Sequence, residues 1–207
     1  MKRKIKRSYY ETLYEVAVAV NSARTPESVL SSIVENVARA LEAKGCSLLL
    51  LTPDRKHLCH TAACGLSDRY IRKGLISVDK STCKALEGKP VAVSDATLDE
   101  RVKFGEDEEK EGIASILSVP MMLREEVIGV IRVYTAERRR FTRDEMHFVS
   151  AVANLGAIAL ENARLYDSIH KDYETFRREL LEWRAAFGDE WIGQEPGVVA
   201  HRWWRFM

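Results

Sequence analysis

The stretch Gly112–Thr135, GIASILSVPMMLREEVIGVIRVYT, points most directly to the fold. Residues 115–123 and 127–135 are apolar runs of strand length, and the polar residues 124–126 separate them. Two strands with so short a polar connection pair most simply as an antiparallel hairpin. Gly129 lies within the second run, where the absence of a side chain lets another backbone or side chain approach closely.

Before this hairpin, apolar side chains recur at helical spacing. They predict helices over residues 8–22 and 26–44. Thr25 suits the N-cap of the second helix because its hydroxyl can accept a free backbone N–H. Pro26 suits the first helical position, where its missing N–H costs nothing. Gly45 is expected to end this helix.

Between the second helix and the hairpin, shorter elements are expected. Apolar runs bounded by turn residues predict strands over 46–51, 57–63 and 91–93. Short helices are expected near 79–86 and over 106–111. Helices followed by an antiparallel meander and a further helix place the protein in the α+β class, with a central antiparallel sheet and flanking helices.

A very long helix follows the hairpin, and a capping box of Thr142 and Glu145 begins it. Its apolar residues alternate three and four positions apart over about five heptads, as in a coiled coil. One series holds Val152, Ala159, Tyr166, Tyr173, Leu180 and Phe187, and the other holds Leu155, Asn162, Ile169, Phe176 and Trp183.

The polar residues of this helix favour a parallel, in-register homodimer. Asn162 is the one polar residue in the two series, and a buried asparagine can fix register. Asp172 and Glu179 fall opposite Arg177 and Arg184 of a partner helix in that frame. The alternative is that residues 142–166 pack on their own sheet and the remainder is a solvated amphipathic tail.

Several segments, taken in order, resemble the GAF domain family. Residues 112–120 look like the strand that enters the family's central hairpin, and 127–131 like its returning strand. Phe141-Thr142 with Glu145 resembles the entry to the last helix, and 157–166 resembles its exit. Asp95 and Phe104 stand where the family often carries an aspartate and an aromatic residue. The resemblance covers about residues 8 to 166.

The resemblance implies a GAF-like (PAS-related) fold with a small-molecule pocket between one sheet face and residues 75–115. The candidate lining residues are Cys83, Val93, Asp95, Phe104, Ile113, Ser115 and Leu117, with Asp95 and Ser115 as polar contacts. It also implies that the first and last helices pack on a partner subunit. The candidate interface residues are Val16, Val20, Ala159, Asn162, Tyr166, Ile169, Tyr173, Phe176, Leu180 and Trp183.

Four segments of the chain are distinguished on these grounds. Residues 1–7 form a basic start, and residues 8–166 form the GAF-like domain with its first and last helices. Residues 167–187 are a coiled-coil extension of the last helix. Residues 188–207 are rich in tryptophan, and exposed aromatic side chains usually dock on something.

Several activities of GAF folds need residues that this sequence lacks. Bilin-binding domains carry a cysteine in the segment equivalent to 95–112, which has none, so no covalent bilin is expected. Free methionine sulfoxide reductases use several pocket cysteines, whereas Cys83 stands without a resolving thiol. His57, Cys59 and His60 alternate across a strand, which argues against one tetrahedral metal site. The residue pattern of cyclic-nucleotide-binding GAF domains is not recognisable.

The composition is that of a folded protein without a dominant charge. Of 207 residues, 46% are hydrophobic and 30% charged, and the net charge of +1 gives no field that attracts nucleic acid or an anionic membrane. No apolar run reaches the ~18 residues of a membrane span. No apolar signal stretch follows the basic start. We therefore expect a cytoplasmic chain with reduced cysteines and no nucleic-acid or membrane partner.

The sequence thus favours a non-catalytic GAF-type sensory module in signal transduction. It would bind a small molecule, form a homodimer, or do both, and pass its signal to an output protein. Two alternatives stay open. One is a purely structural dimerisation module with no ligand. The other is a redox enzyme or thiol sensor acting through Cys83, which the missing second thiol disfavours. No motif identifies a ligand or cofactor.

Overall fold

The computed structural model describes residues 2–22, 25–72, 74–77, 84–100 and 106–187. Backbone contacts divide the chain into two compact units, residues 1–163 and 164–207. The first unit contains the whole sheet and the helices that cover it. The second contains the remainder of the last helix.

Helices and strands follow the order expected for an α+β protein. The described helices are α1 (Lys2–Ser22), α2 (Pro26–Ala40), α3 (Asp68–Ile71), α5 (Glu106–Glu111) and α6 (Arg143–Phe187). The strands are β1 (Gly45–Leu51), β2 (His57–Cys64), β3 (Ile76–Ser77), β4 (Val91–Val93), β5 (Ser115–Leu123) and β6 (Glu126–Thr135).

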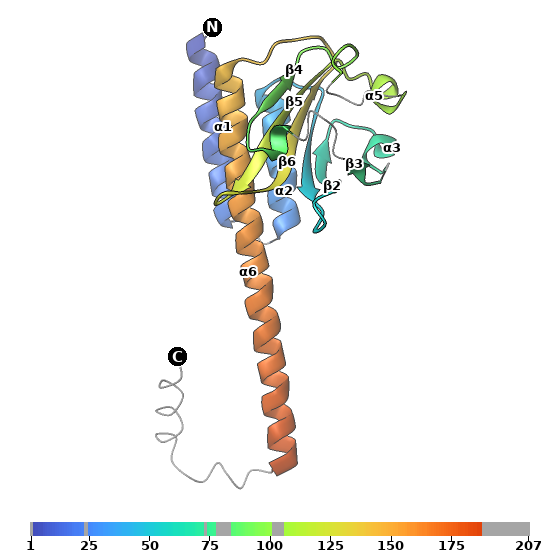
Figure 1. Cartoon of the computed structure of the whole chain (residues 1–207). Coiled ribbons are helices and arrows are strands. Elements are labelled where there is room, and N and C mark those ends of the chain that lie inside the picture. The colour runs from blue at the N-terminus through green and yellow to red at the C-terminus, as the bar shows by residue number, and fades with distance from the viewer. Residues whose placement is uncertain (1, 23–24, 73, 78–83, 101–105, 188–207) are drawn as a thin grey trace. The chain divides into compact units, whose positions relative to one another are not determined.

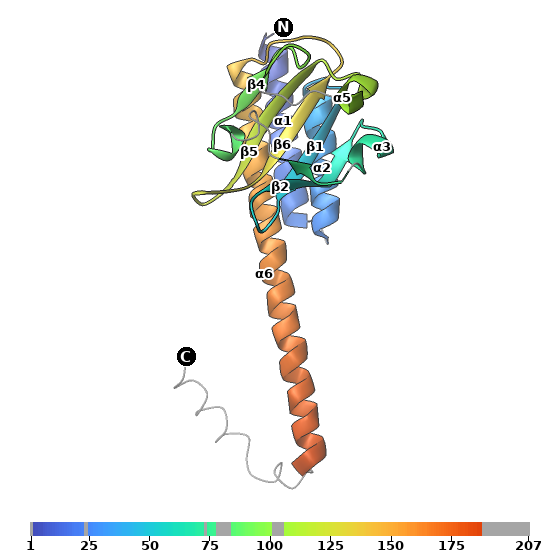
Figure 2. The same cartoon turned by 45° about the vertical axis from the view of Figure 1, so that its right-hand side comes forward.

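The strands form one six-stranded antiparallel sheet in the order β3-β2-β1-β6-β5-β4. The hairpins β1–β2 and β5–β6 lie side by side because β1 pairs with β6. Helices α1 and α2 and the first part of α6 lie along one face of the sheet (Figure 1). The view in Figure 2 shows the order of the strands across the opposite face. The predicted α+β class is confirmed.

Side chains of the central strands enter two separate apolar cores. Leu117 of β5 and Val133 of β6 are cross-strand partners, and both pack against α2 and α6 in the larger core. Ile116 and Tyr134 are the adjacent pair and belong to a smaller core that includes Tyr70 of α3. Successive side chains of a strand point to opposite faces, so residue parity decides which core a side chain enters.

The central hairpin is confirmed, and Gly129 has the role that its place in the strand predicts. An added Cβ at Gly129 would lie 2.4 Å from the carbonyl oxygen of Leu49 on β1. A backbone oxygen on a central strand cannot move aside as the end of a flexible side chain can. The glycine is therefore required for β6 to lie against β1.

We expect Gly129→Ala to lower the free energy of unfolding by about 1–3 kcal/mol, the usual cost of overpacking. Chemical denaturation followed by circular dichroism measures the change. Gly156→Ala is the matched control. Its Cβ would meet side-chain ends rather than backbone, Ile33 Cδ1 at 3.2 Å and Met121 Cε at 3.3 Å, and alanine favours a helix. Equal losses in the two variants would contradict this reading of Gly129.

Two details of the second helix differ from the prediction. The helix ends at Ala40 rather than at 44, and Leu41 is its C-cap. Glu42 then takes a positive φ of 49°, which no helix continues. Gly45 does not end the helix but begins β1, where an added Cβ would lie 2.7 Å from the carbonyl oxygen of Cys64. Close strand pairing, not helix capping, explains this glycine.

The N-cap of α2 agrees with its prediction, whereas two short elements were not predicted. Thr25 caps α2, and its hydroxyl accepts the Ser28 N–H at 3.4 Å. α3 and β3 were not predicted, because each is too short to show a period. Most of the helix expected at 79–86 lies outside the described residues. Within the described part of the chain, no helix has the length and hydropathy needed to cross a membrane.

Candidate functional site

A row of polar side chains crosses the sheet on the face opposite α1, α2 and the first part of α6. Arg132 of β6 has Ser47 of β1 and Ser118 of β5 as its cross-strand partners. All three are buried, with exposures of 0% for Ser47, 5% for Arg132 and 1% for Ser118. We call Ser47, Arg132 and Ser118 the polar row. A buried arginine in the middle of a sheet is uncommon and points to a specific role.

Aromatic side chains adjoin the polar row. The hydroxyl of Tyr134 lies 3.0 Å from that of Ser47, which ties the ring to β1. Tyr70 of α3 meets Tyr134 edge to face, with ring centroids 5.9 Å apart, and meets His60 of β2 at 6.1 Å. The Tyr70 hydroxyl donates to Glu108 Oε1 of α5 at 3.2 Å. The cluster therefore holds α3 and α5 against this face.

Burial and nearby charges shift the pKa values of Tyr70 and Tyr134. Burial raises the pKa of Tyr70, and the charges of Tyr134 and Glu108 raise it further, while Arg132 opposes the shift. Burial also raises the pKa of Tyr134, and here too Arg132 opposes it, helped by the hydrogen bond with Ser47. Both phenols are therefore neutral hydrogen-bonding groups at physiological pH. The guanidinium of Arg132 is close enough to act on both.

The structure separates the predicted pocket residues instead of bringing them together. Val93 and Ile113 are buried in the smaller core, on the face of the polar row. Leu117 belongs to the larger core on the helix face, so its assignment to the same pocket is wrong. Its parity on β5 places it opposite Ile116. Cys83 and Phe104 lie outside the described residues.

Asp95 anchors a loop instead of facing the polar row. It accepts hydrogen bonds from the Thr97 hydroxyl at 2.6 Å and the Thr97 N–H at 3.1 Å, and pairs with Arg138 at 2.9 Å. The hydrogen bond from the Thr97 hydroxyl is the largest cause that lowers the pKa of this carboxyl. Asp95, Asp99 and Glu100 line a shallow hollow beside β4. The side chains that line this hollow are acidic, whereas the polar row contains an arginine and two serines.

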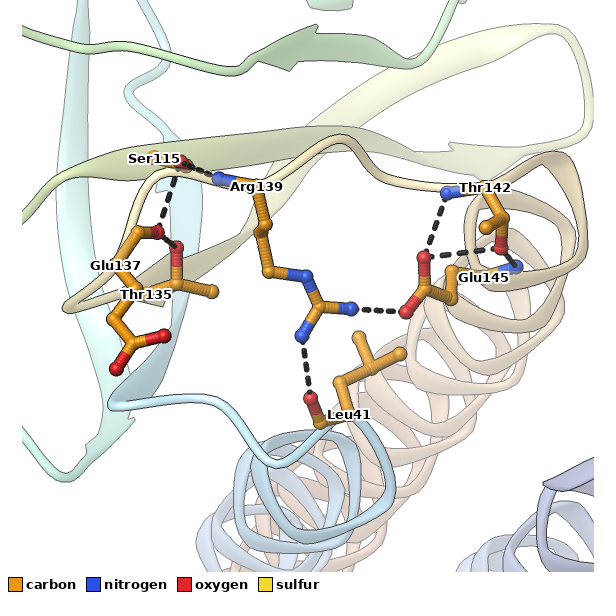
Figure 3. A network of polar contacts seen from close by, with 7 residues as sticks. All are labelled: Leu41, Ser115, Thr135, Glu137, Arg139, Thr142 and Glu145. Carbon is orange, nitrogen blue, oxygen red and sulfur yellow. Dashed lines mark hydrogen bonds and ion pairs between the residues drawn. The ribbon is translucent and has the colours of Figure 1, made fainter. Parts of the chain in front are cut away.

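Ser115 belongs to a hydrogen-bond network on the helix side, so its predicted place in the pocket is also wrong. Its hydroxyl donates to the Ser94 carbonyl at 2.7 Å and accepts the Arg139 N–H at 2.9 Å. Figure 3 shows how the Arg139 side chain continues from there to the Leu41 carbonyl, 3.0 Å away, and to Glu145. Ser115 therefore fixes the connection from β6 to α6.

Glu145 and Thr142 confirm the predicted capping box. The Thr142 N–H donates to Glu145 Oε2 at 2.6 Å, and the Glu145 N–H donates to the Thr142 hydroxyl at 3.2 Å (Figure 3). Glu145 also forms an ion pair with Arg139, which packs over the ring of Phe141 at 5.0 Å. One carboxylate thus caps α6 and holds the arginine that reaches the end of α2.

The polar row was missed because its residue types are ordinary in a sequence. The signal that could have found it is Arg132, a charged residue in the apolar run Val130 to Tyr134. A buried charge on a central strand lowers the stability of the fold unless a partner group compensates it. Among the described residues, no group of three histidine, cysteine or acidic side chains is placed to hold a metal ion.

A second surface feature lies on α1 and on the part of α6 within the first unit. Tyr10, Tyr14 and Val18 recur every four residues along α1 and are exposed, as is Ile158 of α6. A groove between the two helices adjoins them, lined by Tyr9, Tyr10, Leu13, Asp144, His147, Phe148 and Ala151. Such a strip of apolar surface on two neighbouring helices is typical of an interaction site.

The predicted interface residues of this unit lie mostly beneath that surface. Val16 is fully buried in the chain's own core, and Ala159 is 7% exposed, so neither offers area to a partner. Val20 is partly buried against the same core. The reason is that α1 and α6 also pack on α2 and the sheet. Asn162 is exposed at the end of this unit.

In the second unit, α6 exposes its apolar heptad residues. Tyr166, Ile169, Tyr173, Phe176 and Leu180 are all exposed, with Ile169 at 68% and Phe176 at 55%. We call these five residues the heptad stripe. They occupy the two predicted series, spaced by three and four residues along one side of the helix. The side chain of Trp183 lies outside the described set.

Comparison of the sequence with protein families gives one match. The profile of the GAF domain matches residues 23–161, which include the whole sheet and the start of α6 up to residue 161. A comparison with curated proteins gives no match.

Solved structures share the fold at low sequence identity. The GAF domain of a phosphoenolpyruvate-protein phosphotransferase from Coxiella burnetii is 21% identical, with a TM-score of 0.71 over 78% of this chain and 98% of that one. A domain of a putative two-component sensor histidine kinase from Sinorhizobium meliloti is 20% identical (TM-score 0.61; 72% and 99% covered). The free methionine-R-sulfoxide reductase of Neisseria meningitidis is 15% identical (TM-score 0.64; 76% and 91% covered).

Proposed function

Because the chain belongs to the GAF domain family, whose members are mostly regulatory sensory modules, we propose that it is a non-catalytic sensory module. It binds a small molecule on the sheet face that carries the polar row, and it forms a homodimer through α1 and α6. It passes its state to an output protein. The observation that carries this proposal is the exposed heptad stripe. Five large apolar side chains on one side of a helix are unfavourable in water and become buried when a second helix packs against them.

The homodimer follows from the spacing and the exposure of the stripe. Residues spaced alternately by three and four stay on one side of a helix, so they can be buried against the same side of an identical helix. Complete burial of each apolar side chain contributes about 1.5–3 kcal/mol. In this chain Arg177 lies 3.7 Å from Glu174, and on dimerisation it would also be placed to meet an acidic residue of the second helix.

Ligand binding is supported by the chemistry of the opposite sheet face. The polar row and the hydroxyls of Tyr70 and Tyr134 place several hydrogen-bonding groups among apolar residues such as Val93 and Val130. A few converging polar groups in an apolar setting are typical of small-molecule sites. Structures that share the fold include a domain of a methyl-accepting chemotaxis protein, a signalling context that agrees with this role.

Native mass spectrometry of the protein as purified from cells tests both parts of the proposal. We expect a species of twice the 23.6 kDa chain mass, with a discrete additional mass that is lost under denaturing conditions. A dimer without added mass would support the second candidate, a structural dimerisation module. The close packing of Tyr134, which is fully buried, favours that candidate. A bare monomer would contradict both.

A redox function is the weakest of the three candidates. It rests on Cys83, which lies outside the described residues. Burial raises the pKa of the thiols of Cys46 and Cys64, so both are protonated and unreactive at neutral pH. A Cys83→Ser variant that kept the full signalling response would remove this candidate.

A further inference from the structure

The polar row has the geometry of a binding site for a charged group. Ser47 and Ser118 flank Arg132 on the two neighbouring strands, at the same level of the sheet. Neighbouring strands lie about 4.8 Å apart, so the Arg132 guanidinium and the Ser118 hydroxyl of the next strand can reach one small ligand group together, while Ser47 lies on the other side of Arg132. Central strands hold them, and sites on such elements are more precise than sites on loops.

Ser118 supplies an independent observation. Its side chain is 1% exposed, and within the described part of the protein its hydroxyl has no hydrogen-bond partner. A buried hydroxyl without a partner is destabilising, because it has lost its hydrogen bonds to water. Alanine would fill the same position on β5 without that cost. The hydroxyl is explained if a bound group accepts its hydrogen bond.

Arg132 determines the charge of the group that would bind there. Its guanidinium presents five N–H donors in a planar fork that matches the two oxygens of a carboxylate or phosphate. Arg132 has contacts within the protein, and five donors allow a ligand to be bound as well. Glu108 faces the same cluster, but it receives the Tyr70 hydroxyl on the side of α3 and α5.

We propose that the polar row binds the anionic group, a carboxylate or a phosphate, of the ligand that this module senses. The proposal rests on the proposed sensory function and names the class of ligand. Arg132 holds the charge, and Ser118 donates a hydrogen bond to an oxygen of the anion. The hydroxyl of Ser47 is shared with Tyr134, so it orients that ring at the edge of the site.

Thermal unfolding of the purified full chain with two probes tests this assignment. Inorganic phosphate and succinate are titrated separately against sodium chloride at constant ionic strength. We expect at least one probe to raise the unfolding temperature to a plateau, because a ligand that binds only the folded state stabilises it. A response to phosphate alone indicates a phosphorylated ligand, and a response to succinate alone indicates a carboxylate. No response to either would overturn the proposal.

Two variants locate the response. Ser118→Ala should unfold at the same temperature as wild type or higher without a probe, yet bind the probe about tenfold more weakly, as the loss of one hydrogen bond to a charged group predicts. Arg132→Gln should abolish the response, whereas Arg140→Gln, which removes an exposed charge, should keep it. An unchanged probe affinity in Ser118→Ala would show that the polar row is not the site.

The outcomes separate this proposal from the sensory function itself. A neutral or cationic molecule released from the purified dimer would leave the sensory function intact and refute the anionic site. A saturable response that requires Arg132 and Ser118 would support both.

Discussion

Replacing Ile169 and Phe176 together by glutamate is expected to turn the proposed dimer into a monomer. Both side chains are exposed in the single chain, and both occupy the heptad stripe. In a parallel dimer each would pack against its own copy, so the double variant removes four apolar side chains and places four carboxylates in the interface. Unpaired buried charges are strongly unfavourable.

The size of this effect follows from the apolar area alone. With about 1.5 kcal/mol for each of the four side chains, the dimer loses about 6 kcal/mol, or about four orders of magnitude in the dissociation constant. Size-exclusion chromatography with light scattering, at micromolar protein, should give twice the 23.6 kDa chain mass for wild type and a single chain for the variant.

A matched control is available on the same helix. Ser168→Glu with Thr175→Glu adds the same two charges at the same spacing of seven residues, on exposed positions outside the stripe. We expect this variant to stay dimeric. If it dissociates equally, the cause is general charge repulsion. If the Ile169 and Phe176 variant stays dimeric, the contact lies elsewhere, for example on the strip of Tyr10, Tyr14 and Val18 on α1.

The elements of this fold were predictable where their pattern is local. The run from Ser115 to Thr135 shows both strands and their turn, because the apolar runs match strand length and the polar connection is short. The capping box of Thr142 and Glu145 places the start of α6 within one residue, since it depends on residues three positions apart. The two-residue strand β3 has no such pattern.

The candidate site was less predictable, because it depends on which face of the sheet each residue takes. Four of the residues predicted to line one pocket are divided between the two faces: Val93 and Ile113 lie on the face of the polar row, whereas Ser115 and Leu117 lie on the helix face. One residue of register decides this, and register is set by pairing with distant strands. Arg132 was overlooked because a single charge within an apolar run resembles an exposed position.

The interface prediction illustrates how one helix serves two purposes. The heptad pattern runs without a break from Val152 to Leu180 in the sequence. In the structure Val152 and Ala159 are buried in the chain's own core, while the five residues of the heptad stripe, Tyr166 to Leu180, are exposed. Sequence spacing alone cannot distinguish these two parts, because a helix needs an apolar stripe both to pack on the sheet of its own chain and to pack on a partner helix.

Arg139→Ala is expected to lower the free energy of unfolding by about 2–3 kcal/mol, less than the ~3–5 kcal/mol lost when a fully buried pair is broken, because Arg139 is partly exposed. The guanidinium binds the Leu41 carbonyl and Glu145 and packs over Phe141. Its removal leaves Glu145, which is 8% exposed, without its ion pair. The Arg139 N–H bond to Ser115 persists in the variant, so the loss reports the side chain alone.

A double-mutant cycle with Glu145→Ala separates the ion pair from the remaining contacts. We expect a coupling energy of about 1–2 kcal/mol, since the two residues touch directly. Urea denaturation of the single and double variants measures it, and Arg140→Ala, at the exposed neighbouring position, should change stability by less than about 0.5 kcal/mol. A coupling near zero would mean that Glu145 acts through its capping box alone. In that case Arg139 would hold the end of α2 without contributing to the start of α6, and a shift in the sheet would have no route through this pair to the helix that we propose as the dimer contact.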